Sequence, residues 1–336
     1  MGKEMCKNPL ISILVTCFNR REFIIEAVKS ILNQTLKREL YEIIVSKNFK
    51  DAEIDTFLSK NGCKVLYDER GGIGLRLTGM IIESQADILV FMEDDDKFEI
   101  EKLEHVLKIF SSTEVVYFHN DYKIVDSENH IISENSIDNM KSEQIFTLPI
   151  TSFNTVKKLY QKKAFFSMSN ISIRKAVLLK YISNLSKIKL IPDFYIFLIA
   201  LQNNGLIAVS QFQLTVWMFH SSTSVSNGSK TSFINKRKQF WLKVTSDLEQ
   251  CLTIVSTNYL KTLVECVYSE ALTHDFLLGV PNISRSTLIY LVSRELALFR
   301  DKRSFLVFLA ALAGIIAQKN SLIIYSNFLL RKSPKS

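Results

Sequence analysis

The chain has 336 residues, of which 47% are hydrophobic and 23% are charged. This composition is ordinary for a globular protein and excludes a chain that is disordered throughout, and the length predicts one large α/β domain with an appended region, or two domains. The net charge of +8 arises in residues 230–336, which carry 15 basic and 7 acidic side chains, so this region is expected to meet an anionic partner.

Strands and helices alternate through the first hundred residues. The apolar run at residues 10–15 predicts a buried strand, and apolar residues at helical spacing predict a helix over residues 23–32. Further strands are predicted at residues 41–45, 63–67 and 88–92, with helices at residues 51–58 and 71–84 between them. This order is typical of an α/β fold with a mainly parallel sheet.

Four consecutive carboxylates, Glu93, Asp94, Asp95 and Asp96, follow the predicted strand at residues 88–92. Acid runs are usually solvated turns, but this one lies where ligands bind in open α/β sheets. Two carboxylates ~5 Å apart repel by roughly 3 kcal/mol at an effective dielectric constant near 20, so a buried cluster needs a cation. Oxygen ligands favour Mg²⁺ or Mn²⁺, and Mg²⁺ usually shares its coordination with substrate phosphates. The stretch therefore suggests a metal that holds a phosphorylated substrate.

Three glycines, Gly71, Gly72 and Gly74, precede the helix that ends near residue 84. They follow the third strand rather than the first and lack the full spacing of a dinucleotide-binding fingerprint, so a tight turn into the helix is the better interpretation. Arg76 then lies in the first turn, where it can face an anion.

The family resemblance of the chain rests on four segments and on their order. They lie at residues 12–20, 30–35, 72–79 and 91–96. The first contains Thr16-Cys17-Phe18-Asn19-Arg20 and the last is Phe91-Met92-Glu93-Asp94-Asp95-Asp96. Through them, residues 9–110 resemble the nucleotide-binding half of the family-2 glycosyltransferases, which have the GT-A fold. The resemblance implies a GT-A domain at residues 1–229, with its acceptor half at residues 111–229, and a helical region at residues 230–336.

The resemblance also implies the roles of individual residues. The nucleotide sugar would contact Thr16, Phe18, Asn19, Arg76 and Asp94, with Phe18 stacked on the base and Arg76 near the diphosphate. Asp95 would be the principal ligand of Mg²⁺ or Mn²⁺, with Asp96 as a second ligand.

One departure from the family pattern concerns the base. Where the family has acidic residues after the second strand, this chain has Ser46 and Lys47, and only Asp51 matches the final acid of that motif. Asp51 is therefore included among the nucleotide-sugar-binding residues, and the identity of the base stays open.

Asp193 is the only acidic side chain within residues 144–246, and it directly precedes an apolar helical run at residues 194–201. By the resemblance, an acid here acts as the general base. As an N-cap it would instead stabilise the helix by ~1 kcal/mol without any chemistry. Both roles are compatible, because a helix N-terminus also favours an ionised carboxylate. If Asp193 is only structural, Asp121 or Asp126 is the next candidate.

The second half of the predicted domain contains three further elements. A strand is expected at residues 115–118, residues 170–175 are predicted to start a helix, and an apolar strand within residues 213–220 ends in His220. A lone histidine in this position is more often structural than functional. The resembling family has a histidine here that approaches the metal or the diphosphate, so His220 is a third candidate metal ligand.

The pattern is helical after residue 233. The apolar run at residues 305–317 would span ~20 Å as a helix, which is short of a ~30 Å hydrocarbon core. A buried bundle helix and an interfacial helix with basic flanks remain open. Because nucleic-acid-binding signatures are absent, we expect no nucleic-acid partner and favour a peripheral membrane contact. The absence of a signal peptide and of a metal-ligand spacing among the five cysteines predicts a cytoplasmic protein, at the inner face of the cell membrane.

We therefore predict an inverting, metal-dependent glycosyltransferase that moves a sugar from a nucleotide diphosphate sugar to a hydroxyl acceptor on a glycan, a polysaccharide or a lipid. One alternative is a sugar-phosphate nucleotidyltransferase, which normally starts with a glycine-rich phosphate loop that residues 16–21 lack. The other is a non-catalytic nucleotide-sugar-binding scaffold at a membrane, which is compatible with Ser46 and Lys47.

Overall fold

The structure is a computed structural model that describes residues 8–69, 71–126, 130–133, 144–147, 152–203, 205–219 and 230–278. The chain separates into two compact units. One consists of Met1–Thr151 and Lys162–His220, and the other of Ser152–Gln161 and Ser221–Ser336. The boundary predicted after residue 229 lies outside the described residues.

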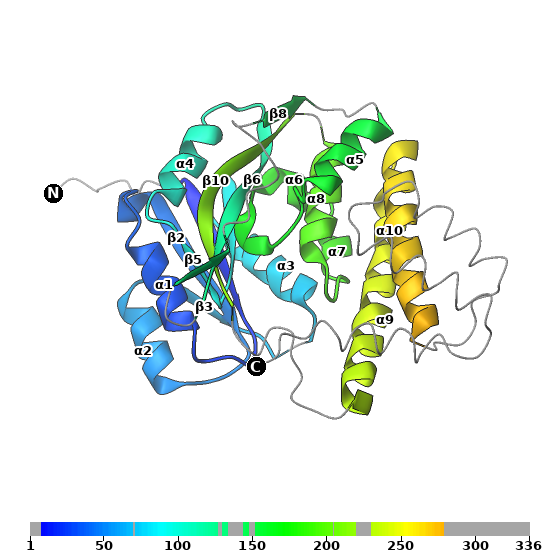
Figure 1. The fold of residues 1–336 in the computed structure, drawn as a ribbon. Coiled ribbons are helices and arrows are strands. Elements are labelled where there is room, and N and C mark those ends of the chain that lie inside the picture. Colours follow the sequence, from blue (N-terminus) through cyan, green and yellow to red (C-terminus); the bar gives the residue numbers. More distant parts are fainter. Residues whose placement is uncertain are drawn as a thin grey trace. The chain divides into compact units, whose positions relative to one another are not determined.

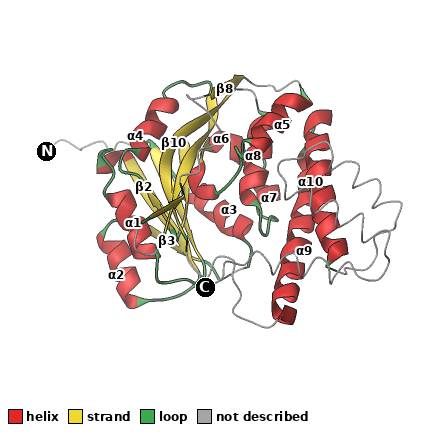
Figure 2. Ribbon diagram, in the orientation of Figure 1, coloured by secondary structure: helices red, strands yellow, loops and turns green. Residues whose placement is uncertain are grey.

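A mixed sheet forms the centre of the first unit (Figures 1 and 2). In the described part of the chain it has ten strands, in the order β3-β2-β1-β4-β9-β6-β10-β5, with β7 beside β6 and β8 beside β10. The strands are β1 (Ile11–Cys17), β2 (Tyr41–Lys47), β3 (Lys64–Tyr67), β4 (Ile88–Glu93), β5 (Asp96–Phe98), β6 (Val115–Val125), β7 (Ile131–Ser133), β8 (Gln144–Thr147), β9 (Ile171–Arg174) and β10 (Leu206–Met218). The predicted α/β fold is confirmed.

The first half of the sheet is parallel. β1 pairs in parallel with β2 and with β4, and β3 pairs in parallel with β2. The register places Thr16 opposite both Ser46 and Glu93. Because the carboxyl ends of parallel strands meet at one edge, the residues that follow Cys17, Lys47 and Glu93 come together there.

Helices cover both faces of this parallel half. On one face, α1 (Ile24–Leu32), α2 (Ala52–Lys60) and α4 (Lys102–Ile109) share an apolar core with the β1 side chains Ile13 and Val15, both fully buried. On the other face, α3 (Ile73–Glu83) contacts β1 and β2. Burial on both faces explains why these strands read as continuous apolar runs in the sequence.

The start of α3 depends on two glycines. Gly72 has φ +105°, a conformation that favours glycine. A Cβ at Gly74 would lie 2.0 Å from the Leu185 carbonyl oxygen, and the Gly74 N–H donates to the Ile188 carbonyl at 2.9 Å. The glycine segment is thus a tight turn that packs closely on another backbone segment, and it places Arg76 in the first turn of α3.

The second half of the sheet is mixed. One prediction from the sequence is wrong in this half. Residues 171–174 form β9 rather than the start of a helix, and the short helix α6 (Lys175–Leu179) begins only after it. β9 pairs antiparallel with both β4 and β6, and Ile171 and Ile173 are fully buried. Pairing on both edges thus makes these residues a strand, in keeping with the preference of β-branched isoleucine for strands.

Helix α8 (Pro192–Gln202) follows α7 (Ile182–Leu185) and is buried on nearly all sides, as its apolar sequence predicts. Phe197 of α8 makes an edge-on ring contact with Tyr117 of β6, with 6.1 Å between centroids. The cap residue of α8 is Ile191, and Asp193 lies in the first turn after Pro192. The interpretation of Asp193 as an N-cap is therefore wrong, because proline occupies the first helical position.

The second unit is helical in its described part, as predicted. Its helices are α5 (Phe153–Gln161), α9 (Lys230–Ile254) and α10 (Asn258–Leu277), and α10 packs against both α5 and α9. Trp241 of α9 stacks on His274 of α10 with 3.9 Å between ring centroids. The apolar run at residues 305–317 lies outside the described residues. Among the helices described, none is long and apolar enough to cross a membrane.

Candidate active site

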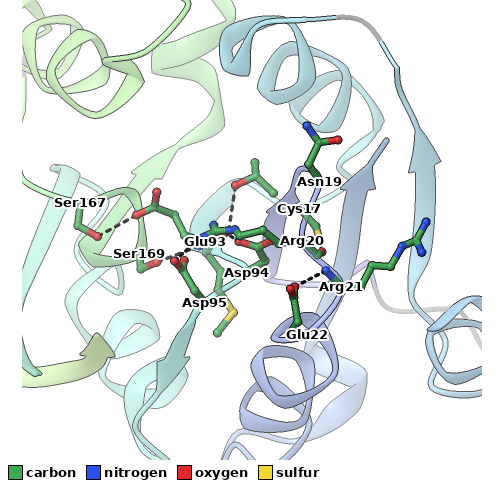
Figure 3. A network of polar contacts seen from close by, with 12 residues as sticks. Cys17, Asn19, Arg20, Arg21, Glu22, Glu93, Asp94, Asp95, Ser167 and Ser169 are labelled. Atoms are coloured by element: carbon green, nitrogen blue, oxygen red, sulfur yellow. Dashed lines mark hydrogen bonds and ion pairs between the residues drawn. The ribbon is translucent and has the colours of Figure 1, made fainter. Parts of the chain in front are cut away.

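An arginine joins two of the four consecutive carboxylates at the carboxyl edge of the parallel strands (Figure 3). One terminal N–H group of Arg20 donates a hydrogen bond to Oδ1 of Asp94, and the other terminal nitrogen donates one to Oδ2 of Asp95. Arg20 follows β1 and the two aspartates follow β4, so parallel pairing of these strands brings the three side chains together. The Arg20 side chain is 31% exposed, against 1% for Asp94 and 7% for Asp95.

Burial and like charges raise the pKa values of the Asp94 and Glu93 carboxyl groups in this cluster. Desolvation raises the pKa of Asp94 to about 6, which exceeds the opposing effect of Arg20. Desolvation and the nearby carboxylates Asp95 and Asp193 raise the pKa of Glu93 to about 7. The Asp94 Oδ2 atom is buried and receives no hydrogen bond from nitrogen or oxygen in the described residues, although the Cys17 thiol interacts with this carboxyl group.

Asp96 has different surroundings from Asp94 and Asp95. Its carboxyl group interacts with Ser169 and with the ammonium group of Lys102. Lys102 is fully buried in α4; its Nζ donates to the Ser169 carbonyl and, at 2.9 Å, to Oγ1 of Thr215, and it lies 3.8 Å from the Phe98 ring centroid. Desolvation raises the pKa of Asp96 and lowers that of Lys102. Oδ1 of Asp96 has no hydrogen-bond partner among the described residues.

Phe18 and Arg76 lie together, as expected for two residues that contact one nucleotide. The Arg76 guanidinium carbon is 4.2 Å from the centroid of the Phe18 ring, which is 36% exposed. Arg76 itself is buried; desolvation lowers its pKa, against the opposing charges of Asp68 and Asp94. Its Nε atom has no hydrogen-bond partner among the described residues. The hydroxyl of Thr16, in β1, lies 3.5 Å from the Met92 carbonyl oxygen of β4.

Asn19 and Asn48 form a reciprocal amide pair between the ends of β1 and β2. The Asn19 N–H donates to Oδ1 of Asn48 at 2.8 Å, and Nδ2 of Asn48 donates to Oδ1 of Asn19 at 2.7 Å. Asn19 has φ +59°, a conformation that asparagine tolerates better than most residues. The pair fixes the backbone that carries Phe18 on one side and Arg20 on the other.

Asp51 and Lys47 interact with α2. Asp51 is the N-cap of α2, and its Oδ1 accepts from the Ile54 N–H at 3.1 Å. Lys47, at the position where the resembling family has an acid, is buried; its Nζ pairs with Asp55 at 2.7 Å and donates to the Phe49 carbonyl. A base contact by either side chain would compete with these interactions.

Asp193 is linked to the carboxylate cluster through Ser167. The backbone N–H groups of Ser167 and Phe194 donate to the Asp193 carboxylate, and the Ser167 hydroxyl donates to Glu93 at 3.3 Å (Figure 3). Desolvation raises the pKa of Asp193 to about 6, although these backbone hydrogen bonds lower it. The structure thus brings the candidate base, from α8, close to the candidate metal and nucleotide residues of the parallel half.

Asp94 and Asp95 offer part of a site for a divalent ion. His220 lies outside the described residues. Within the described ranges, no three histidine, cysteine or acidic side chains are grouped as a complete metal site. Asp94 and Asp95 offer hard oxygen donors, and the buried Asp94 Oδ2 lacks a nitrogen or oxygen donor. Such a pair fits Mg²⁺ or Mn²⁺ if substrate phosphate and water complete the coordination.

The sequence analysis missed two cations, Arg20 and Lys102. Arg20 could have been found, because a buried acid cluster needs a counter-charge and Arg20 is the basic residue just after the neighbouring strand. Lys102 gave no comparable signal, because a lysine at the start of a helix is usually solvated. Its burial depends on Ser169 and Thr215, which are distant in sequence.

Comparison with known proteins identifies the class to which this arrangement belongs. The family model described as glycosyl transferase family 2 matches residues 12–182, which is half of the chain. The chain therefore belongs to glycosyl transferase family 2, and the resemblance noted from the sequence is confirmed.

Two curated relatives are uncharacterised glycosyltransferases of Rickettsia. The protein of Rickettsia prowazekii is 30% identical over 134 residues, covering 38% of this chain and 41% of the relative. That of Rickettsia bellii is 28% identical over 133 residues, covering 38% of this chain and 19% of the relative. The matches thus span less than half the length of these relatives.

Two solved structures share the fold. S. aureus TarS 1–349 in complex with UDP-GlcNAc is 15% identical, with a TM-score of 0.59, and the match covers 94% of this chain and 91% of that one. The mannosyltransferase PcManGT of Pyrobaculum calidifontis, in complex with GDP-Man and Mn²⁺, is 12% identical, with a TM-score of 0.54 and coverage of 93% and 88%.

Proposed function

We propose that this protein transfers a sugar from a nucleotide diphosphate sugar to a hydroxyl acceptor, with inversion at the anomeric carbon and with Mg²⁺ or Mn²⁺ as cofactor. The observation that carries the proposal is the meeting of Asp94, Asp95, Phe18 and Arg76 at the carboxyl edge of the parallel strands, with Asp193 linked to it through Ser167. The structures of TarS and PcManGT with nucleotide sugars support this choice of donor.

The donor would be bound by residues of the parallel half. Phe18 presents an exposed aromatic face on which a base can stack. Arg76 is a buried cation whose Nε has no hydrogen-bond acceptor among the described residues, and a diphosphate would supply one. Asp95 would hold the divalent ion, with Asp94 in place of the predicted second ligand Asp96, whose carboxyl group interacts with Ser169 and Lys102. The ion, when bound, neutralises charge on the leaving diphosphate.

Asp193 would act as the general base. As the acceptor hydroxyl oxygen forms its bond to the anomeric carbon, the bond from that carbon to the diphosphate oxygen breaks and the hydroxyl proton passes to Asp193. A pKa of about 6 leaves Asp193 ionised at neutral pH, but closer to the operating pH than an ordinary aspartate. A single displacement of this kind inverts the anomeric configuration and needs no covalent nucleophile.

The test is a panel of UDP-, GDP-, ADP- and dTDP-sugars, with nucleoside diphosphate release and donor affinity measured with and without Mn²⁺. We expect Mn²⁺-dependent binding and turnover of at least one donor. Asp95→Asn should weaken Mn²⁺-dependent donor binding by at least about 10-fold, or ~1.4 kcal/mol. The matched control is Asp87→Asn, at the other end of β4, where Asp87 is exposed and pairs with Arg174.

The same panel tests the scaffold alternative, and a second assay with nucleoside triphosphates and sugar phosphates tests the nucleotidyltransferase alternative. A scaffold would bind a nucleotide sugar without metal-dependent turnover. A nucleotidyltransferase would release pyrophosphate from a nucleoside triphosphate and a sugar phosphate. Family membership favours the transferase over both.

We further propose that residues 230–336 bind an anionic membrane surface at the cytoplasmic face, because their 15 basic side chains exceed 7 acidic ones. Each basic group near such a surface contributes ~1 kcal/mol, which salt screens. Co-sedimentation with anionic vesicles should therefore be strong at low salt and weak at high salt. Equal recovery in the supernatant with anionic and neutral vesicles would contradict this.

A further inference from the structure

We propose that Arg20 is an internal counter-cation that a divalent ion displaces from Asp94 and Asp95, and that the released guanidinium then binds the diphosphate of the donor. The inference rests on the proposed metal-dependent function. It assigns a role to the Arg20 side chain, which is hydrogen-bonded to both candidate metal ligands when no metal is bound.

The present contact opposes a metal held by the same two carboxylates. Arg20 donates to one oxygen of each aspartate and so bridges the two carboxylates. An ion bound to these carboxylates would lie next to the guanidinium group, and two like charges would then share one small, largely buried site. Their repulsion favours the departure of one of the two cations.

The guanidinium group is the cation that can move. Its side chain is 31% exposed, whereas the carboxylates are buried at 1% and 7% exposure. Its backbone is held in place, because the Cys17 thiol donates to the Arg20 carbonyl at 2.9 Å and the Asn19–Asn48 pair fixes the preceding residue. Rotation of the side chain alone would free both aspartates and leave the loop unchanged.

The contact with Arg20 also leaves the cluster incompletely satisfied. Arg20 supplies one positive charge to two carboxylates, and the buried Asp94 Oδ2 receives no nitrogen or oxygen donor in the described residues. A divalent ion matches both charges, so exchange improves the charge balance. The displaced guanidinium remains at the carboxyl edge of β1, beside Phe18, where the donor diphosphate would arrive.

The first experiment measures Mn²⁺ affinity without nucleotide, from the electron paramagnetic resonance signal of free Mn²⁺ at pH 8. Arg20→Met should bind Mn²⁺ about 10-fold tighter than the parent, since a charge-assisted hydrogen bond no longer has to be broken. Arg20→Lys keeps one charge but cannot bridge both carboxylates. Its Mn²⁺ affinity should therefore lie between those of the parent and Arg20→Met. Arg21→Met is the matched control, because the neighbouring Arg21 is 60% exposed and approaches Asp51 rather than the cluster, and its affinity should equal the parent's.

The second experiment measures the affinity for UDP and GDP at saturating Mn²⁺ by calorimetry. For whichever nucleotide the parent binds more tightly, Arg20→Met should bind about 10-fold more weakly, because the diphosphate loses a charged partner. The two effects have opposite signs. Simple loss of structure would weaken both affinities, and circular dichroism of each variant checks the fold; if Arg20→Met does not fold, Arg20→Lys carries the same test with smaller changes.

The outcomes separate the inference from the proposed function. Equal or weaker Mn²⁺ binding by folded Arg20 variants, with Mn²⁺-dependent nucleotide binding in the parent, would overturn the exchange and leave the metal-dependent function standing. If neither the parent nor the variants bind Mn²⁺, with or without nucleotide, the metal dependence fails as well, and Arg20 is then a permanent counter-ion.

Discussion

The two halves of the sheet in the first unit position their functional residues differently. In the parallel half, β1, β2 and β4 end at one edge, so short segments directly after these strands bring Phe18, Arg20 and Asp94 together. In the mixed half, β9 runs antiparallel to its neighbours β4 and β6, and Asp193 reaches the cluster from a helix through Ser167. Strand order alone brings Phe18, Arg20 and Asp94 together, whereas the position of Asp193 depends on helix packing.

The largest expected effect tests whether the mixed half supplies the catalytic base. Asp193→Asn should reduce transfer by about 10² to 10⁴-fold, the usual contribution of a positioned base, and leave donor binding nearly unchanged. Asparagine keeps the shape of the side chain and its acceptor for the Phe194 and Ser167 N–H groups. Steady-state transfer and donor affinity measure the two effects.

Transfer by Asp193→Asn within a few-fold of the parent would assign Asp193 to structure. The next candidates would then be Asp121 and Asp126, which have dissimilar surroundings. Asp121 is fully buried in β6 and accepts from the Tyr122 N–H, whereas Asp126 pairs with His130 near the surface. Asparagine substitutions at these two positions would decide between them.

A second substitution tests donor binding by the parallel half. Phe18→Ala should weaken donor binding by ~1–3 kcal/mol, the usual value of a base stacked on an aromatic ring. The control is Phe212→Ala in β10, since Phe212 is also exposed and contacts the ring of His105. Equal donor affinities for the two variants would show that Phe18 does not stack on the base and that its role is the contact with Arg76.

A third pair of substitutions tests the packing that places Arg76. Gly74→Ala should lower the free energy of unfolding by ~1–3 kcal/mol, because its Cβ would meet the Leu185 carbonyl at 2.0 Å. Gly79→Ala, in the same helix with nothing within 4 Å, should raise it by ~0.5–1 kcal/mol. Urea denaturation measures both free energies of unfolding. An unchanged free energy of unfolding in Gly74→Ala would mean that the segment at Leu185 and Ile188 moves away at little cost.

The smallest effect concerns pH. Burial raises the pKa of Asp193 to about 6, so below that pH the carboxyl is protonated and cannot accept the acceptor proton. At saturating donor and Mn²⁺ we expect kcat to rise with pH through about 6 and then to level off, and the rise should be smaller in Asp193→Asn, in which Asp94 and Glu93 still titrate. A rate independent of pH between about 5 and 8 would argue against Asp193 as the base.

The amino-acid sequence was enough to predict the α/β class, the strands β1, β2 and β4 and the family, because strands buried on both sides of a parallel sheet leave continuous apolar runs and the functional residues follow them directly. The tertiary structure alone decided what depends on distant partners. Residues 171–174 become β9 because strands bind both of its edges. Lys102 is buried because Ser169 and Thr215 accept its hydrogen bonds, and Arg20 pairs with Asp94 and Asp95 because β1 lies beside β4. These contacts join residues that are more than 50 positions apart, so they cannot be predicted from local sequence patterns.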